Sequence, residues 1–408
     1  MPPRPLFRPS DRDVAALFIW WSSIHAMFHR GWWLVTSLYL VVEADLSAAQ
    51  LLVYGAVLAL TTVATEVPTG VMADTVSRKW SLVLAHLVMG VGMTMTGFVT
   101  AFPLILVTQV LWGLGWTFLS GADIAWVTDE LNRPNRIARV LIARARWVQL
   151  GSAVGLLAFG SLAWLAGLAS AIIAAGLATL ALGAVVAVVF PERNFTRVEE
   201  GHLRESLSIV RRGIALARRD REILSIFAAW LLVNAASEVS FLIPKQLVAL
   251  GLPENPAPIV WLTALGLVTL AAGAVALLFL EARIDGVGAA RRLYVAACAV
   301  GAAGLLIVAH APEDLSAMSG VIVAQGVAWP VARSLSQIRV NQRATSDVRA
   351  TVQSFLAQME SFGEILAGVA LAIVATSASL AVIFTCAAIT AACAGVVIAR
   401  SDRVAGGD

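Results

Sequence analysis

The 408-residue sequence has little charge. Asp, Glu, Lys and Arg together make up 13% of it, whereas ordinary soluble domains contain about 25%. Hydrophobic residues make up 59% and the mean hydropathy is +0.83, so a soluble globule could not bury this much apolar surface. Repeated apolar runs of roughly 20 residues, separated by short charged breaks, predict membrane-spanning helices. They exclude a transmembrane β-barrel, whose strands would be about 10 residues long and alternating in polarity.

Cysteine is also scarce, and motifs of catalysis are missing. Cys298, Cys386 and Cys393 lie inside apolar runs without CxxC or metal-ligand spacing, which favours packing roles. His25 and His29 have the i, i+4 spacing of a metal pair but lack a third ligand, so a proton relay or a polar pair facing a cavity fits better than a metal site. The sequence contains no HExxH motif, paired Asp motif or nucleophile elbow. We therefore expect no enzyme, no metal and no cofactor.

Twelve apolar runs predict an all-α polytopic membrane protein with two pseudo-symmetric six-helix bundles. The predicted spans are 14–42, 47–72, 79–100, 103–128, 138–166, 169–190, 222–250, 257–281, 290–310, 314–338, 350–375 and 377–399.

The only long break lies between spans six and seven. It is rich in Arg and Glu, and apolar residues recur in it at helical spacing, so we expect an amphipathic helix at the membrane surface. The predicted domains are an N-terminal bundle (1–190), a cytoplasmic linker (191–221) and a C-terminal bundle (222–408).

Basic residues mark one side of the predicted membrane. Apart from Arg30 and Lys245, all lie at the termini, in the even-to-odd loops or at the adjoining helix ends. The opposite loops carry acids alone, namely Glu43, Asp45, Glu254, Glu313 and Asp314. The positive-inside rule then places both termini in the cytoplasm. We expect the protein to lie in the cell inner (cytoplasmic) membrane, in contact with membrane lipids. The net charge of +3 reports this orientation and does not indicate nucleic-acid binding.

Residues 66–80, EVPTGVMADTVSRKW, run from the end of one predicted span to the start of the next and contain a very short charged turn. Gly70-x-x-x-Asp74-x-x-Ser77-Arg78-Lys79 resembles the signature loop G-x-x-x-D-x-x-G-R-R/K of the major facilitator superfamily. Residues 66–74, 112–130 and 349–354 resemble the bacterial drug-efflux-like subgroup of that superfamily. A weaker copy of the loop follows span eight, which suggests parallel six-span repeats. Its residues are Asp285, Gly288, Arg291 and Arg292.

The resemblance assigns roles to the loop. Gly70 would let two helices approach closely. Asp74 would face the N-terminus of span eleven, where the helix dipole favours a carboxylate. Arg78, beside Lys79, would bridge Asp74 to Asp129, so the loop would clamp the two halves together and favour the outward-open state. The alternative is a charged turn that only satisfies the positive-inside rule.

The sequence departs from the superfamily pattern in three places. Ser77 replaces the usual glycine, and serine tolerates a positive φ less well. Gln109 stands where the family has an arginine. Span five contains Gly151 and Gly155, which favour helix packing, but not the glycine-proline pair of the antiporter motif.

Spans one, four, seven and ten line the central cavity in this superfamily. In this sequence each of them carries a polar-aromatic stripe at helical spacing. Polar groups are costly in lipid, so these faces should turn inward, and their indole rings suit an amphipathic organic molecule better than an ion. Each tryptophan could instead be an interface anchor or a packing residue. The cavity candidates are His25, His29, Trp32, Gln109, Trp112, Trp116, Trp230, Asn234, Phe241, Gln325 and Trp329.

Charged residues inside the spans are candidates for proton coupling. A carboxyl group in a low dielectric can carry a proton through a conformational cycle, and Asp123 and Glu238 fit this role best. The alternative is a static ion pair of either acid with Arg30 or Lys245. Arg30 should point away from the two histidines and pack against a neighbouring helix. The remaining candidates are Glu360 and Glu364, which share one face and could pair with Arg333.

The resemblance implies a monomeric secondary transporter that exports an amphipathic small molecule by alternating access in exchange for protons. An importer or facilitator of an organic solute with the same fold is the alternative. A polytopic membrane enzyme is a weaker one. Acids and bases nearly balance within the spans, so the charge of the substrate stays open.

Overall fold

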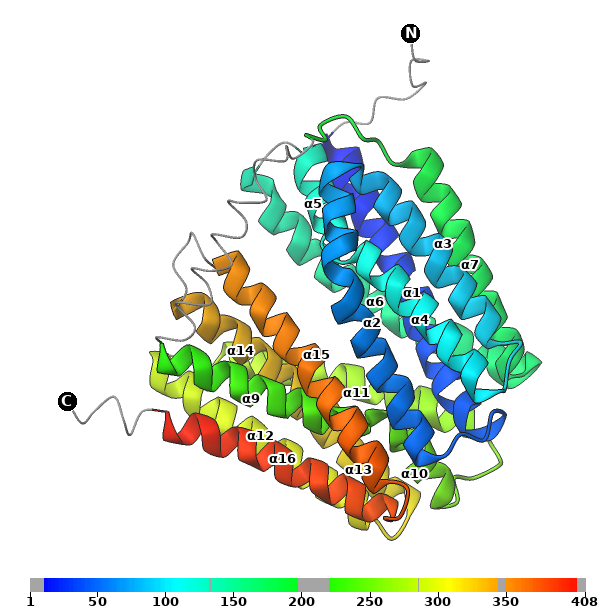
Figure 1. The fold of residues 1–408 in the computed structure, drawn as a ribbon, viewed down its shortest axis with the longest axis vertical. Coiled ribbons are helices and arrows are strands. Elements are labelled where there is room, and N and C mark those ends of the chain that lie inside the picture. The colour runs from blue at the N-terminus through cyan, green and yellow to red at the C-terminus, as the bar shows by residue number, and fades with distance from the viewer. Residues whose placement is uncertain (1–10, 132–133, 197–219, 285, 344–348, 402–408) are drawn as a thin grey trace, which may run out of the picture. The chain divides into compact units, whose positions relative to one another are not determined.

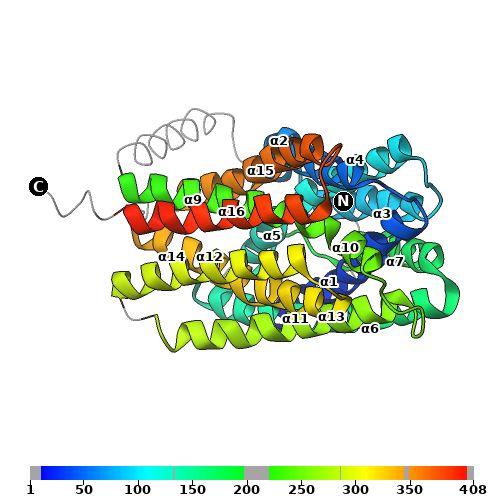
Figure 2. The same cartoon turned by 90° about the horizontal axis from the view of Figure 1, so that it is seen from below.

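The computed structural model describes residues 11–131, 134–196, 220–284, 286–343 and 349–401, and these form helices joined by short connections (Figures 1 and 2). The helices in chain order are α1 (Asp11–Val42), α2 (Ala48–Thr75), α3 (Arg78–Thr96), α4 (Phe102–Leu119), α5 (Ala122–Leu131), α6 (Pro134–Ala166), α7 (Leu168–Val189), α9 (Arg221–Ser237), η1 (Glu238–Leu242), α10 (Ile243–Ala249), α11 (Pro258–Glu281), α12 (Gly286–His310), α13 (Asp314–Val321), η2 (Ile322–Ala328), α14 (Trp329–Arg343), α15 (Arg349–Val374) and α16 (Leu380–Arg400).

The predicted spans correspond to these helices, with ends that differ by a few residues. Within the described part of the chain, 10 helices, some built from consecutive segments, are long and apolar enough to cross a membrane. The other two predicted spans are α1, with 32 residues, and α3, with 19. Histidines and basic residues lower the hydropathy of both. The amphipathic helix predicted for the linker falls mainly on residues 197–219, which lie outside the described residues.

Three of the spans are interrupted, and they are the fourth, seventh and tenth. The fourth breaks between α4 and α5, the seventh passes through the 3₁₀ segment η1, and the tenth passes through the π-helical segment η2. Irregular backbone is tolerated at membrane depth only where protein or a water-filled cavity surrounds it. Such breaks are often found at functional sites. These are also three of the four spans that the sequence marks with polar-aromatic stripes.

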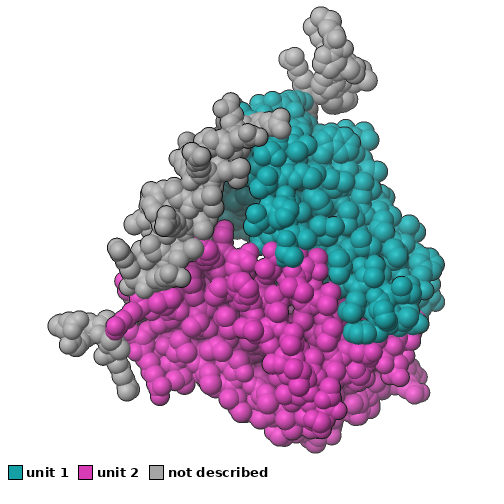
Figure 3. Space-filling view, in the orientation of Figure 1, with its two compact units in different colours: residues 1–39, 64–199 teal, residues 40–63, 200–408 magenta. Residues whose placement is uncertain are grey.

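The chain forms two compact units (Figure 3). Unit 1 comprises residues 1–39 and 64–199, and unit 2 comprises residues 40–63 and 200–408. The end of α1 and the first half of α2 thus belong to the second unit, although chain order groups them with the first bundle.

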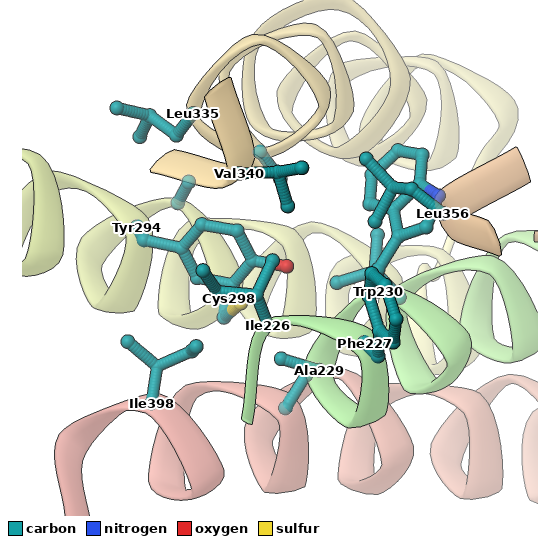
Figure 4. Close-up of a cluster of buried hydrophobic side chains, with 14 of the residues drawn as sticks. Ile226, Phe227, Ala229, Trp230, Tyr294, Cys298, Leu335, Val340, Leu356 and Ile398 are labelled. Atoms are coloured by element: carbon teal, nitrogen blue, oxygen red, sulfur yellow. The ribbon is translucent and has the colours of Figure 1, made fainter. Parts of the chain in front are cut away.

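Each unit has its own apolar core. In unit 1 the core gathers around Phe18, Trp21 and Trp126, which are at most 1% exposed. In unit 2, α9, α12, α14, α15 and α16 contribute a second core (Figure 4). It includes Ile226 and Tyr294, which are fully buried. In a membrane, close van der Waals packing of such side chains, together with interhelical hydrogen bonds, holds the helices of each unit together.

Small residues bring α1 and α6 into close contact. A Cβ atom at Gly151 would overlap the Ser23 carbonyl, and one at Gly155 would overlap the Met27 carbonyl oxygen. The two glycines therefore pack against α1, as the spacing predicts. Ser23 and His25 differ by two residues, or about 200° around the helix, so the histidines lie on the opposite face of α1.

Candidate functional site

The signature loop forms a charge cluster in unit 1. Arg78 is the first residue of α3, and its guanidinium group lies 3.5 Å from Asp74 and pairs with Asp129 on α5. The same group donates a hydrogen bond to the Ala125 carbonyl at 3.0 Å. The structure thus brings together the three charged residues that the resemblance groups. Within unit 1, no described atom lies within 4 Å of a Cβ atom built at Gly70, so no close helix contact is made there inside this unit.

Ser77 is explained by its position at the start of α3. Its backbone is extended, with φ −175°, so the glycine that the family pattern places here is not needed for a left-handed conformation. Its Oγ accepts a hydrogen bond from the Trp80 amide at 3.0 Å and donates one to Glu192 at 2.6 Å. Serine is a favoured N-cap residue and supplies what glycine cannot.

The segment that follows α7 is bound to this cluster, which sequence reasoning missed. The Glu192 carboxylate also accepts a hydrogen bond from the Lys79 amide at 3.0 Å. Glu130 in turn accepts hydrogen bonds from the backbone amides of Arg193, at 2.6 Å, and Asn194, at 3.0 Å. The sequence shows an acid, Glu192, at the start of the predicted linker, but nothing local in the sequence identifies its partners. Each of these hydrogen bonds joins residues more than sixty positions apart.

An aromatic column runs along α1 and α4 in unit 1. His25 and His29 stack with ring centroids 5.9 Å apart and an interplanar angle of 6°. His29 stacks on Trp112 at 5.3 Å and on Trp116 at 5.7 Å. Trp32 stacks on Trp112 at 5.9 Å with an angle of 7°. The structure thus brings together five of the predicted cavity residues, and we call these five rings the aromatic column.

Polar atoms without partners lie in the column and on Gln109, which precedes Trp112 by about one turn of α4. Gln109 is 1% exposed, and neither its oxygen nor its nitrogen has a hydrogen-bond partner among the described residues. The same holds for Nε1 of Trp32 and Trp112 and for Nε2 of His25 and His29. A buried donor or acceptor without a hydrogen bond lowers the stability of the folded protein by about 1–3 kcal/mol. A polar ligand or water would lower that cost.

The other end of the column is satisfied internally. The Trp21 indole N–H donates to Nε2 of His86 at 3.3 Å, so Nδ1 of His86 carries the proton and donates to the Leu82 carbonyl at 2.7 Å. Trp21 stacks on His25 at 5.9 Å. No group of three potential metal ligands is found among the described His, Cys, Asp and Glu residues.

Asp123 forms an ion pair, but with a residue that sequence reasoning missed. Its carboxylate accepts a hydrogen bond from Arg144 on α6 at 2.8 Å, and Arg144 Nε donates to Ser22 at 3.1 Å. A static ion pair was the alternative considered for Asp123, with Arg30 or Lys245 as its partner. Arg30 occupies an exposed position on α1. Arg144 lies near the start of a span, where a basic residue is equally well explained by the positive-inside rule.

The Arg144→Met variant should lower the stability of the protein by about 3–5 kcal/mol, because it leaves the buried Asp123 carboxylate unpaired. Thermal unfolding in detergent would show this. Adding Asp123→Asn should restore most of the loss. Arg146→Met, which removes an exposed arginine from the same helix, is the matched control. Equal stability of Arg144→Met and the parent protein would contradict a structural role for the pair.

Glu238 occupies a close contact within unit 2. It begins η1 and is 3% exposed, and its Oε1 has no hydrogen-bond partner among the described residues. A Cβ atom at Gly55 on α2 would overlap this oxygen and the Phe241 ring. Phe241 also contacts Tyr54 edge-on at 5.8 Å. The carboxyl group of Glu238 thus lies directly against the first half of α2.

The other charged candidates in unit 2 have identifiable neighbours. Glu364 lies close enough to Glu238 to interact with it electrostatically. Arg333 pairs with Glu360 and lies over the Trp230 ring at 5.8 Å. Lys245 donates to the Leu46 carbonyl at 2.8 Å and so anchors the connection between α1 and α2.

The remaining cavity candidates in unit 2 are not gathered into one site. Trp230 is 4% exposed within the apolar core (Figure 4). Trp329 packs against the same core. The Asn234 side chain donates to the Trp230 carbonyl at 2.8 Å. Gln325 lies in η2 and is partly buried. These tryptophans contribute to packing, which was the alternative considered for them.

The second copy of the signature loop makes different contacts. Arg291 donates to the carbonyls of Ile398, at 3.2 Å, and Ala399, so it satisfies the C-terminal end of α16. Asp285 lies outside the described residues.

A further ion-pair cluster in unit 2 was missed at the sequence level. Arg339, 2% exposed, donates to Glu222 at 2.8 Å, and Arg343 pairs with the same carboxylate. The sequence feature that could have indicated this cluster is the pair of arginines four residues apart on α14, which share one face of the helix.

Together, the helical spans, the three interrupted helices and the polar groups buried at those helices define a polytopic membrane transporter. The structure resembles that of the nucleoside transporter NupG, with a TM-score of 0.76 and 14% identity over 97% of this chain and 100% of that chain. It also resembles a bacterial homologue of the human lysosomal transporter Spinster in an inward-facing and occupied conformation, with a TM-score of 0.73 and 14% identity over 97% and 98% of the chains. It also resembles the POT family transporter PepTSo, with a TM-score of 0.73 and 12% identity over 98% of this chain and 100% of that chain.

The sequence matches the Major Facilitator Superfamily over residues 21–368, and the chain belongs to this superfamily. A comparison with curated proteins finds no match. The predicted all-α twelve-helix class is confirmed, and the protein is a transporter and not an enzyme.

Proposed function

We propose that the protein exports an amphipathic organic molecule by alternating access, driven by protons that return through Glu238. The proposal places it in the cytoplasmic membrane with both termini in the cytoplasm. The likeness of residues 66–74, 112–130 and 349–354 to drug-efflux-like members supports the direction. The observation that carries the coupling is the buried Glu238 carboxyl with an unpartnered oxygen.

The setting of Glu238 links its protonation to packing. An ionised carboxylate is costly to bury without a partner, and Glu364 adds a second acid nearby. Proton binding and close packing against α2 therefore stabilise each other. A conformational change that lets water reach η1 would release the proton. Asp123 is already neutralised by Arg144, so the coupling role falls to Glu238 and Glu364 rather than to Asp123.

Flux measurements in proteoliposomes test this proposal. An imposed pH gradient should drive substrate in the direction opposite to proton flow, and a pH-sensitive dye should report proton movement only when substrate is present. Movement of substrate and protons in the same direction would instead identify an importer. Transport without any response to the gradient would identify a facilitator.

The charge cluster at the signature loop supplies a second prediction. Arg78→Gln removes the bridge between Asp74 and Asp129. If this bridge biases the transport states, as the family resemblance implies, flux should fall about tenfold, within the range typical of conformational coupling.

The matched control for this prediction is Arg136→Gln, which removes an exposed arginine from α6. Both variants should be compared at equal amounts of folded protein. Equal flux through the two variants would leave Arg78 as a structural residue.

A further inference from the structure

We propose that the aromatic column is the substrate-binding wall of unit 1 and that the substrate is a flat, uncharged heteroaromatic molecule. This inference rests on the transporter function proposed above and names its substrate class. It is carried by ring geometry, by the exposure of individual rings and by the unpartnered polar atoms beside them.

The rings of the column form two nearly parallel groups, the two histidines and the three tryptophans, and His29 is inclined at 22° to Trp112 and at 24° to Trp116. The interplanar angles are 6° for His25 with His29, 7° for Trp32 with Trp112 and 7° for Trp112 with Trp116. Packed aromatic pairs in a core adopt offset-stacked and edge-to-face geometries alike. A run of parallel faces is extended best by another flat ring, and it gives little advantage to a saturated or bulky molecule.

Exposure divides the column into a buried back and an accessible front. Trp32 and Trp112 are 1% and 5% exposed. His25, His29 and Trp116 are partly exposed. A ligand ring can therefore stack on the front rings, and two of these rings, His25 and His29, carry an unpartnered Nε2 atom.

The unpartnered atoms specify the edge of the ligand. The indole N–H groups of Trp32 and Trp112 are donors only, whereas the Gln109 amide both donates and accepts. They match a molecule with ring nitrogens or carbonyls as acceptors and at least one N–H donor. Pure hydrocarbon rings would leave these groups unsatisfied.

The charges near the column disfavour a cation. Arg144 lies over the Phe18 ring at 5.4 Å, Phe18 stacks on Trp21, and Trp21 stacks on His25. Asp123 is bonded to Arg144 and is not available to a cationic ligand. Arg144 is occupied by the same bond, so a strongly held anion is not favoured either.

Equilibrium binding to the full-length protein in detergent tests this inference without any gradient. The probes are adenosine and theophylline as uncharged planar compounds, ethidium as a planar cation, 2-naphthoate as a planar anion and glucose as a non-aromatic control. Quenching of tryptophan fluorescence, checked by equilibrium dialysis, reports binding. We expect saturable binding of at least one uncharged planar probe, tighter than that of either charged probe and with none for glucose.

Variants assign the binding to the column. Trp116→Leu and Gln109→Leu should each weaken binding by about tenfold or more. Trp116→Phe should retain most of it, because a flat ring is kept. Trp164→Leu, which removes a tryptophan that is 57% exposed on α6, should have no effect. Gel filtration of each variant confirms that it is folded.

The inference is overturned if no uncharged planar probe binds saturably, if a charged probe binds more tightly, or if Trp116→Leu and Gln109→Leu bind like Trp164→Leu. Because binding is measured without a gradient, these results are independent of proton coupling. Gradient-driven flux of a different solute, together with failed binding here, would leave the proposed function standing and reject the substrate class alone.

Discussion

The Glu238→Gln variant should keep its fold and lose proton-driven transport. Glutamine has nearly the same shape as glutamate, so the close contact with Gly55 is retained, but the side chain can no longer carry a proton. We expect the gradient-driven rate to fall by about 100-fold, the scale typical of removing a proton-transfer group. Exchange of substrate without net proton movement should survive, because it does not require Glu238 to change its protonation state. Proteoliposome flux with and without a pH gradient separates the two activities.

Two further variants sharpen this test. Glu254→Gln removes an exposed acid from the connection between α10 and α11 and should leave both activities intact. Glu364→Gln removes the neighbouring acid and should weaken the response to the gradient less than Glu238→Gln does. If Glu238→Gln retains full gradient-driven transport, the coupling proton is carried elsewhere and the assignment made here is incorrect.

The Gly155→Leu variant should be strongly destabilised. A Cβ atom at this position already overlaps the Met27 backbone, so α1 and α6 would have to separate. Overpacking a well-packed site costs about 1–3 kcal/mol or more, and backbone is less able to move than a flexible side chain. We expect a clearly lower unfolding temperature in detergent and a lower yield of folded protein.

Separation of α1 from α6 would also move the histidine face of α1, which lies opposite the glycine contact. Ligand binding by the aromatic column should therefore weaken even in protein that remains folded. Gly288→Leu is the matched control, because nothing lies within 4 Å of a Cβ atom at that exposed position. Similar unfolding temperatures for the two variants would show that the contact between α1 and α6 is not critical.

The spans could be predicted because hydropathy is a local property. A run of about 20 apolar residues is long enough to cross a membrane as a helix whatever its neighbours are. The interruptions were not predicted, although a proline follows each of the two irregular segments. Pro244 and Pro330 lack the amide hydrogen that would bond the carbonyl four residues earlier, which lies inside η1 and η2, respectively.

The candidate site was predictable in unit 1 and much less so in unit 2. On α1 and α4, histidines and tryptophans recur every three or four residues, so they share a face whatever lies opposite. In unit 2, the same type of stripe contains Trp230, which the neighbouring helices bury in the core. A stripe shows which residues share a face, and only the packed neighbours decide whether that face meets ligand or protein.

The sequence by itself determined that the chain is a multi-pass membrane protein, where its helices lie, which loop carries the superfamily signature and which face of α1 and α4 is polar. These follow from hydropathy and from the 100° step of the helix, which are set by residues close together along the chain. The tertiary structure alone decided that Asp123 pairs with Arg144, that Ser77 caps α3 beneath Glu192, and that Glu238 lies against Gly55. Those partners are distant in sequence, so they follow from how helices pack and not from any local pattern.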